Sequence, residues 1–279
     1  MPYTAEVSRS NPSCFLFLID QSGSMDDPFG GDQSGKRKAD GVADAINRLL
    51  QNLVIKCAKS EGVRDYYHVG VLGYGAHVGP AFAGALAGQD LAPVSAIADN
   101  PARVEERARK VDDGAGGLVD QRVKFPVWFE PVAQGGTPMC DVLRGAARTI
   151  ETWLGQHPDC FPPVVINITD GESTDGEPQA DAARLRSLAS SDGNVLLFNV
   201  HLSSHRAPAI EFPASDAGLP DRYAQLLFGL SSPLPPYMRL AARDEGYDVS
   251  DASRGFVFNG DIVSVIRFLD IGTRPANLR

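Results

Sequence analysis

Cysteine is scarce in this sequence, and long apolar runs are absent. The cysteines are Cys14, Cys57, Cys140 and Cys160. They are widely separated and form neither a CxxC pair nor a disulfide-rich spacing. No stretch approaches the ~20 apolar residues that a membrane-spanning helix needs. The polar N-terminal stretch MPYTAEVSRSNPS lacks the apolar core of a signal peptide. We therefore expect a cytoplasmic protein that is not inserted in a membrane.

Basic charge is also in short supply. The chain has 26 Lys and Arg residues against 35 Asp and Glu residues, which gives a formal net charge of −9. Without a basic field there is little to attract phosphates, so we expect neither a nucleic acid nor an anionic membrane as a partner. Hydrophobic residues make up 43% of the chain, which is enough for a full core.

The apolar residues that are present occur in short runs of the kind that form buried parallel strands. Each run is bounded by turn residues, as is typical of strands covered on both faces. The four runs are Phe15–Ile19, Val69–Tyr74, Val164–Ile168 and Val195–Val200. Phe256–Phe258 is a candidate last strand near the sheet edge, and Val127–Phe129, or the stretch just before it, is a candidate antiparallel strand.

Helical patterns alternate with these strands. Apolar residues at spacings of three and four predict helices over Lys38–Ala58 and Pro138–Leu154, with further helices near Gln179–Ala189, Pro236–Glu245 and Asp261–Leu269. Alternating strands and helices predict an α/β fold with a doubly wound, mostly parallel sheet flanked by helices. We expect a single domain over residues 1–279, with a core of about 13–271 and insertions near 80–126 and 203–235. The first insertion contains a polar run at Pro101–Val111 that reads as a helix.

Three loops carry oxygen-bearing side chains to the ends of the predicted strands. FLFLIDQSGSM ends a strand and presents Asp20, Ser22 and Ser24 at i, i+2, i+4 spacing. VVINITDG ends another strand with Asp170, and GGTPM offers Thr137 just before a helix. Because the carboxyl ends of parallel strands meet at one edge of the sheet, we expect the three loops to lie together.

These motifs resemble the metal-ion-dependent adhesion site of the von Willebrand factor A (vWA) family, whose pattern is D-x-S-x-S, then Thr, then Asp. The resemblance covers the core of the chain and implies a Rossmann-like vWA fold. It also implies metal ligands at Asp20, Ser22, Ser24, Thr137 and Asp170. The separation of Ser24 from Thr137 is longer than the family pattern leads us to expect, which agrees with an insertion at 80–126.

The donor types determine the expected chemistry. Hard oxygens suit Mg²⁺, with Mn²⁺ or Ca²⁺ as alternatives. Three of the five ligands are neutral hydroxyls, so the ion keeps much of its charge, and the resemblance implies that an Asp or Glu carboxylate of a partner protein completes its coordination. Asp26, Asp27 and Glu172 lie close by in sequence and could tune this field or hold a second ion, although a solvated acidic turn is the simpler interpretation.

The resemblance favours a protein-interaction module over an enzyme. One hypothesis is a bacterial adapter for a kinase, phosphatase or ATPase in a stress-response, phospho-signalling or defence system. A second is a substrate-recruiting subunit of an AAA+ chelatase-like ATPase, and a third, disfavoured by the lack of a signal sequence and of disulfides, is an extracellular adhesin. A metal-dependent phosphohydrolase is less favoured, since such enzymes generally want a second carboxylate where Ser22 stands.

Two other motifs have simpler explanations. GGDQSGK at 30–36 fits the start of a phosphate-binding loop, but Arg37 follows where Ser or Thr is required, and the glycines begin ten residues after the strand. His201 and His205 have the i, i+4 spacing of a helical zinc site, but His201 is expected at a strand end, followed by a loop. We interpret these histidines as solvated or locally bonded.

Overall fold

The computed structural model describes residues 3–28, 36–112, 118–203, 207–260 and 262–272, and its centre is a mostly parallel sheet. The strand order along this sheet is β13-β14-β12-β9-β1-β4-β5, with β6 paired to β4. Its strands are β1 (Ser13–Asp20), β4 (Tyr67–Tyr74), β5 (Val78–Pro80), β6 (Ala92–Pro93), β9 (Val164–Thr169), β12 (Leu196–His201), β13 (Ile210–Glu211) and β14 (Phe256–Phe258). The contacts between β4, β1, β9, β12 and β14 are parallel, whereas β5, β6 and β13 pair antiparallel at the edges.

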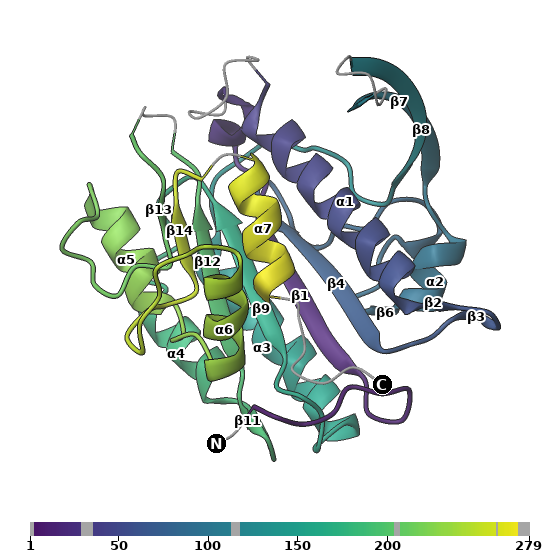
Figure 1. The fold of residues 1–279 in the computed structure, drawn as a ribbon. Helices are drawn as coiled ribbons and strands as arrows, with labels where there is room; N and C mark the ends of the chain where they lie inside the picture. The colour runs from purple at the N-terminus through teal and green to yellow at the C-terminus, as the bar shows by residue number, and fades with distance from the viewer. Residues whose placement is uncertain (1–2, 29–35, 113–117, 204–206, 261, 273–279) are drawn as a thin grey trace.

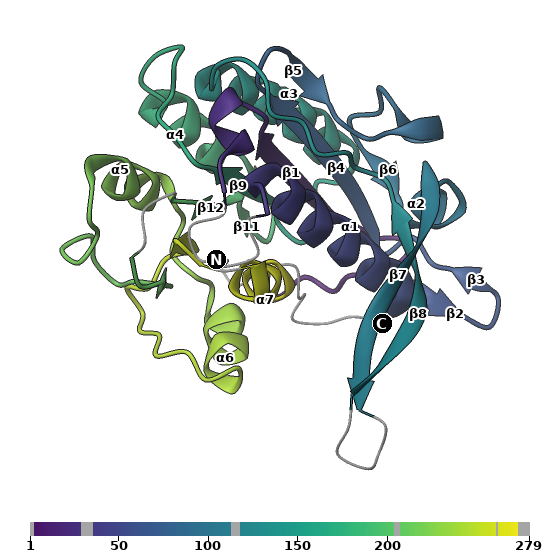
Figure 2. The same ribbon diagram turned by 90° about the horizontal axis from the view of Figure 1, so that it is seen from above.

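Helices cover both faces of the sheet (Figure 1, Figure 2). The α-helices are α1 (Lys38–Cys57), α2 (Val94–Asp99), α3 (Met139–Gln156), α4 (Gln179–Ser187), α5 (Arg222–Leu230), α6 (Pro236–Asp244) and α7 (Ile262–Gly272). Two short 3-10 helices are η1 (Gly23–Asp26) and η2 (Gly84–Leu86). Figure 1 shows α1, α6 and α7 in front of the sheet and α3, α4 and α5 behind it. The doubly wound α/β fold expected from the sequence is confirmed.

The two faces of β1 show why this arrangement is stable. All eight residues of β1 are buried, because successive side chains point into opposite layers. Phe15 and Phe17 join the apolar core beneath α1 and α7, whereas Leu16 and Leu18 join the core beneath α3. Within the described residues, no helix has the length and apolar composition needed to cross a bilayer.

Two-stranded ribbons lie outside the main sheet. They are β2 (Ala58–Lys59) with β3 (Gly62–Val63), β10 (Ala189–Ser190) with β11 (Gly193–Asn194), and β7 (Arg103–Asp112) with β8 (Leu118–Val127). The expectation of a helix at Pro101–Val111 was wrong, because ten consecutive antiparallel pairs with β8 make this stretch a strand. The antiparallel strand expected at or just before Val127 is confirmed by β8, and the hairpin projects away from the helices in Figure 2.

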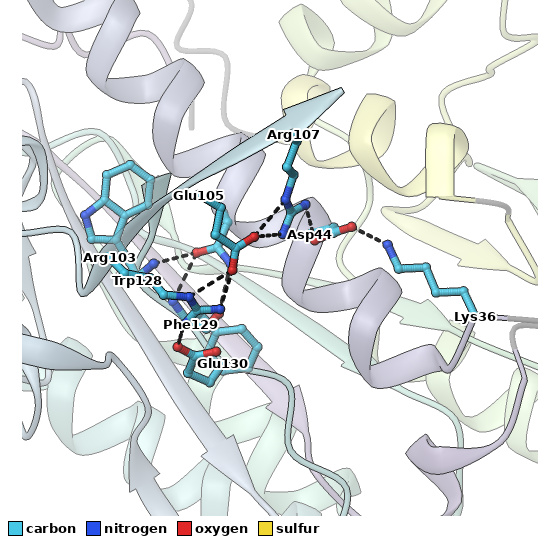
Figure 3. Close-up of polar contacts among 9 residues, drawn as sticks. Lys36, Asp44, Arg103, Glu105, Arg107, Trp128, Phe129 and Glu130 are labelled. Atoms are coloured by element: carbon cyan, nitrogen blue, oxygen red, sulfur yellow. Dashed lines mark hydrogen bonds and ion pairs between the residues drawn. The ribbon is translucent and has the colours of Figure 1, made fainter. Parts of the chain in front are cut away.

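The base of the β7–β8 hairpin is fixed to α1 by buried hydrogen bonds (Figure 3). The side-chain oxygen of Asn47 accepts from the backbone N–H groups of Trp128 (2.8 Å) and Phe129 (3.0 Å), and its Nδ2 donates to the Phe129 carbonyl (2.8 Å). Asp44 accepts from Arg107 at 2.7 Å, and Arg107 stacks over the Phe125 ring. The hairpin is therefore anchored to the helix that begins beside the loops described below.

The N-terminal segment is held at the end of the sheet away from the start of α1. The backbone N–H groups of Thr4 and Ala5 donate to the two carboxylate oxygens of Asp192, at 3.0 and 2.9 Å. Tyr3 packs against Phe161, with ring centroids 6.4 Å apart. In Figure 1 this segment, in dark purple, lies at the end of the molecule away from the start of α1.

Candidate metal centre

The D-x-S-x-S segment turns sharply at the carboxyl end of β1. Asp20 is only 1% exposed, and its Oδ1 accepts the backbone N–H of Ser22 at 2.8 Å. This bond brings the chain around into η1, where the hydroxyls of Ser22 and Ser24 lie 3.0 Å apart. The oxygens of this one loop therefore converge.

The second predicted loop meets the first. β9 pairs parallel with β1, so Asp170 follows its strand at the same edge as Asp20. The Ser24 hydroxyl donates to Asp170 Oδ1 at 2.7 Å, joining residues that are 146 positions apart in the chain. The expectation that these residues lie together holds in the structure.

The third loop, which carries Thr137, is bonded to both of the others. The Gly23 N–H donates to the Gly135 carbonyl at 3.0 Å, which ties it to the D-x-S-x-S loop. Thr137 N–H donates to Thr174 Oγ1 at 3.0 Å, and Thr174 N–H donates to the Thr137 carbonyl at 2.9 Å. Thr137 is 5% exposed, and its hydroxyl makes no hydrogen bond to any described residue. The five predicted ligands thus come from three mutually bonded loops.

Two glycines allow this close approach of backbones. Gly135 has φ of +91°, and a Cβ there would lie 2.4 Å from the backbone N of Ala76. A Cβ on Gly136 would lie 2.9 Å from Thr174 Oγ1. A larger residue at either position would push the Thr137 loop away from its neighbours.

The start of α3 is fixed by a residue from the Asp170 loop. The carboxylate of Asp175 accepts the N–H groups of Cys140 (3.0 Å) and Asp141 (2.9 Å), which are otherwise unsatisfied at a helix N-terminus. Partial burial opposes ionisation, but these two backbone donors and the Ser173 hydroxyl lower the pKa of Asp175. This cap holds Thr137 in place relative to Asp170.

Sequence reasoning missed Thr169, which orients Asp20. Its hydroxyl donates to Asp20 Oδ2 at 2.6 Å, so both carboxylate oxygens of Asp20 are engaged. Thr169 is fully buried as the last residue of β9. The local signal was its place directly before Asp170 in ITDG, because a strand-end residue beside a site residue lies within reach of the neighbouring strand.

Burial perturbs the ionisation of Asp20. Desolvation raises the pKa of this carboxyl to about 6, since the charged form loses its hydration. The hydrogen bonds from Ser22 and Thr169 oppose this change, and the nearby Asp170 adds to it. A cation placed beside Asp20 would stabilise the charged carboxylate and offset part of this desolvation cost.

Lys38 is the second residue that sequence reasoning missed. It is the first residue of α1 and only 2% exposed, and its ammonium nitrogen lies 2.7 Å from Asp170 Oδ2. Nothing in the local sequence distinguishes it from Lys36, which is 38% exposed at its side chain and pairs with Asp44 instead.

The additional acids near the site have protein partners. Asp26 Oδ1 accepts from Arg37 at 2.9 Å. Asp27 Oδ2 lies 3.8 Å from the Lys38 ammonium. Glu172 contacts Arg222 at 3.3 Å and accepts from the Tyr223 hydroxyl. These partners favour a structural role for the acids over a second ion site.

The remaining motifs add no cation ligand among the described residues. Residues 30–35 of GGDQSGK and His205 lie outside the described residues. His201 ends β12, as expected, but it is buried instead of solvated, at 4% exposure. Desolvation lowers the pKa of His201.

The residues present fit a hard divalent cation. Two carboxylates and three hydroxyls are all oxygen donors, the class that Mg²⁺, Mn²⁺ and Ca²⁺ prefer. The Ser24 hydroxyl lies within hydrogen-bond distance of both the Ser22 hydroxyl and the Asp170 carboxylate. The Thr137 hydroxyl has no hydrogen-bond partner among the described residues. The donor set would hold a cation at the carboxyl edge of β1 and β9.

Thr169→Val is expected to weaken Mg²⁺ binding about tenfold at pH 7. The change removes a hydrogen bond to a buried carboxylate, an interaction worth about 1.5–3 kcal/mol, and so favours the protonated form of Asp20. Isothermal titration calorimetry measures the affinity. Thr152→Val, on the exposed side of α3, is the control, and equal affinities in all three proteins would contradict the role of Thr169.

Comparison with known proteins gives distant matches to solved structures. No protein-family model and no curated protein matches this chain. Proximal thread matrix protein 1 from the mussel byssus is 16% identical with a TM-score of 0.44, over 82% of this chain and 43% of that one. The PilB minor pilin from Streptococcus sanguinis is 12% identical with a TM-score of 0.45, over 94% and 61%.

The vWF domain of the type V pili tip protein Mfa5 from Porphyromonas gingivalis is also similar. It is 15% identical with a TM-score of 0.34, over 58% of this chain and 39% of that one. This chain therefore spans less than two thirds of each of these three proteins.

Proposed function

We propose that this chain is a vWA-family interaction module that binds a partner protein through a divalent cation. Asp20, Ser22, Ser24, Thr137 and Asp170 would hold the cation, with Mg²⁺ as the expected ion and Mn²⁺ or Ca²⁺ as alternatives. The observation that carries the proposal is the 2.7 Å bond from Ser24 to Asp170. It joins the two halves of the motif at the carboxyl ends of the strands, where doubly wound folds bind ligands.

The donor set supports binding over catalysis. Only Asp20 and Asp170 are charged among the five residues, so a bound dication would retain charge and accept an external carboxylate oxygen. A partner Asp or Glu would complete its coordination. Ser22 stands where a phosphohydrolase would generally need a second carboxylate, and we accordingly propose a protein that is not an enzyme.

The biological setting is also a proposal. We propose a cytoplasmic adapter that works with a kinase, phosphatase or ATPase in a bacterial stress-response, phospho-signalling or defence system. The four cysteines are all buried and unpaired, which agrees with a reducing compartment.

Ser22→Ala is expected to abolish cation-dependent partner binding. Immobilised wild-type protein should retain a specific protein from a lysate of the source cells in Mg²⁺ and release it in EDTA. Ser22→Ala and Asp20→Ala should retain none, because each removes a ligand. Ser187→Ala, an exposed serine on α4, should behave as the wild type does.

Two results would contradict the proposal. One is partner binding that EDTA and Asp20→Ala leave unchanged. The other is phosphoester hydrolysis by the pure protein that Asp20→Ala removes, since that would make the site catalytic. A retained AAA+ ATPase whose turnover changes would identify the chain as a recruiting subunit of a motor.

A further inference from the structure

A buried lysine contacts the candidate metal centre directly. The Lys38 ammonium nitrogen lies 2.7 Å from Asp170 Oδ2 and 3.4 Å from the Ser24 carbonyl oxygen. Both side chains of the ion pair are nearly inaccessible, with Lys38 2% and Asp170 1% exposed. Solvent screens a pair in this position far less than it screens a surface pair.

The two oxygens of Asp170 therefore have separate partners. Oδ1 accepts the Ser24 hydroxyl, and Oδ2 accepts the Lys38 ammonium. A lysine ammonium is a compact positive charge with three donors and no acceptor. It cannot ligate a cation, so its effect on a cation at this site is repulsive.

The charges in the site show what this lysine changes. Among the buried charges, Asp20 and Asp170 carry two formal negative charges, and Lys38 reduces the sum to about one. The carboxylate of Asp27 lies 3.8 Å from the Lys38 ammonium, but its side chain is 58% exposed, so solvent screens its charge. A divalent cation would then leave the site with about one net positive charge, which one further carboxylate would neutralise. Without Lys38 the cation alone would neutralise the site, and an added carboxylate would leave it negative.

We propose that Lys38 makes tight cation binding at this site depend on an anionic ligand. Its charge opposes binding of the cation alone and favours binding of a carboxylate to the cation-loaded site. The effects of the two ligands on each other are reciprocal: the carboxylate raises the affinity for the cation by the same factor by which the cation raises the affinity for the carboxylate. The inference rests on the proposed function.

Lys38→Met is the direct test, because methionine replaces the buried stem without the charge. The probes are Mn²⁺ alone and Mn²⁺ with acetate, with free Mn²⁺ followed by electron paramagnetic resonance. Lys38→Met should bind Mn²⁺ alone about tenfold more tightly than the wild type. Acetate should raise Mn²⁺ affinity in the wild type and have at least threefold less effect in the variant.

Three further variants separate charge from packing. Lys36→Met removes a lysine that pairs with Asp44 and lies two residues away, and it should bind Mn²⁺ as the wild type does. Lys38→Arg keeps the charge and should keep the acetate effect. Lys38→Gln keeps a hydrogen-bond donor without the charge and should behave as Lys38→Met does, which preserves the test if the methionine variant does not fold.

The outcomes distinguish this inference from the proposed function. If the wild type binds Mn²⁺, and both Lys38→Met and Lys38→Gln bind it with equal or lower affinity, the role of Lys38 is overturned and the metal centre stands. Mn²⁺ binding that Asp20→Ala does not change, or no binding by the wild type, would overturn the metal centre and this inference with it.

Discussion

Asp20→Asn is expected to stabilise the metal-free protein by about 3 kcal/mol at pH 7.5 while abolishing cation binding. Burial raises the pKa of Asp20 from its ordinary 3.8 to about 6 in the folded protein. Each pH unit of such a difference corresponds to about 1.4 kcal/mol. The folded wild type retains this proton more firmly than the unfolded chain does. Ionisation of Asp20 should therefore leave the free energy of unfolding of the wild type unchanged below about pH 4 and lower it as the pH rises to about 6.

Urea unfolding in EDTA at pH 4 and pH 7.5 measures this effect. The free energies of unfolding should agree at pH 4, and the variant should exceed the wild type at pH 7.5. Adding Mg²⁺ at pH 7.5 should then stabilise the wild type alone, because only a ligand that binds the folded state shifts the equilibrium. Asp216→Asn, an exposed acid on a loop, is the control. A variant less stable than the wild type at pH 7.5 in EDTA would contradict the burial argument.

Asn47→Ala is expected to destabilise the protein by about 3–5 kcal/mol. The Asn47 side chain satisfies two buried backbone donors and one carbonyl at Trp128 and Phe129, all within 3.0 Å. Alanine would leave these groups unpaired in a site where Trp128 and Phe129 are each 2% exposed. Each buried group without a partner costs about 1–3 kcal/mol.

Urea unfolding gives the magnitude, and hydrogen exchange locates it. The amides of Trp128 and Phe129 should lose protection before those of β1 do. Asn52→Ala, on the same helix without a side-chain hydrogen bond to any described residue, should change stability by less than about 1 kcal/mol. Similar losses in both variants would show that helix propensity, and not the hydrogen bonds of Asn47, sets the effect.

The central sheet could be predicted closely because its strands are covered on both faces. A strand in this position must be largely apolar, so FLFLI and VVINI stand out from the polar loops around them. The expected helices over Lys38–Ala58 and Pro138–Leu154 agree with α1 and α3 to within two residues at each end.

The β7–β8 hairpin shows where local reasoning failed. The sequence RVEERARKVD has the Glu, Arg, Lys and Ala content of a good helix, and its apolar residues Val104, Ala108 and Val111 recur at helical spacings of four and three. Its conformation is set by pairing with Leu118–Val127 and by the contacts of Arg107 with Asp44 and Phe125. Such partners are distant in sequence, and they override an intrinsic preference of a few tenths of a kcal/mol per residue.

The candidate site likewise has a part that the sequence predicts and a part that it does not. Its five oxygen donors belong to motifs of adjacent residues at strand ends, and the parallel sheet brings these motifs together. Lys38 belongs to no motif, because its partner Asp170 is 132 residues away and the burial of its ammonium depends on where α1 begins. Sequence spacing can thus predict which atoms would bind a cation, whereas the charges that tune the cation come from tertiary structure.

The Asp192 clamp on the N-terminal segment has a mechanical consequence. It holds Thr4 and Ala5 at one end of the sheet, and the proposed partner would bind at the other end, beside Asp20. A tensile load between the N-terminus and a bound partner would thus run lengthwise along β1. Because β1 is paired with β4 on one side and β9 on the other, two parallel ladders would bear that load in shear, and their hydrogen bonds would have to break together instead of one at a time.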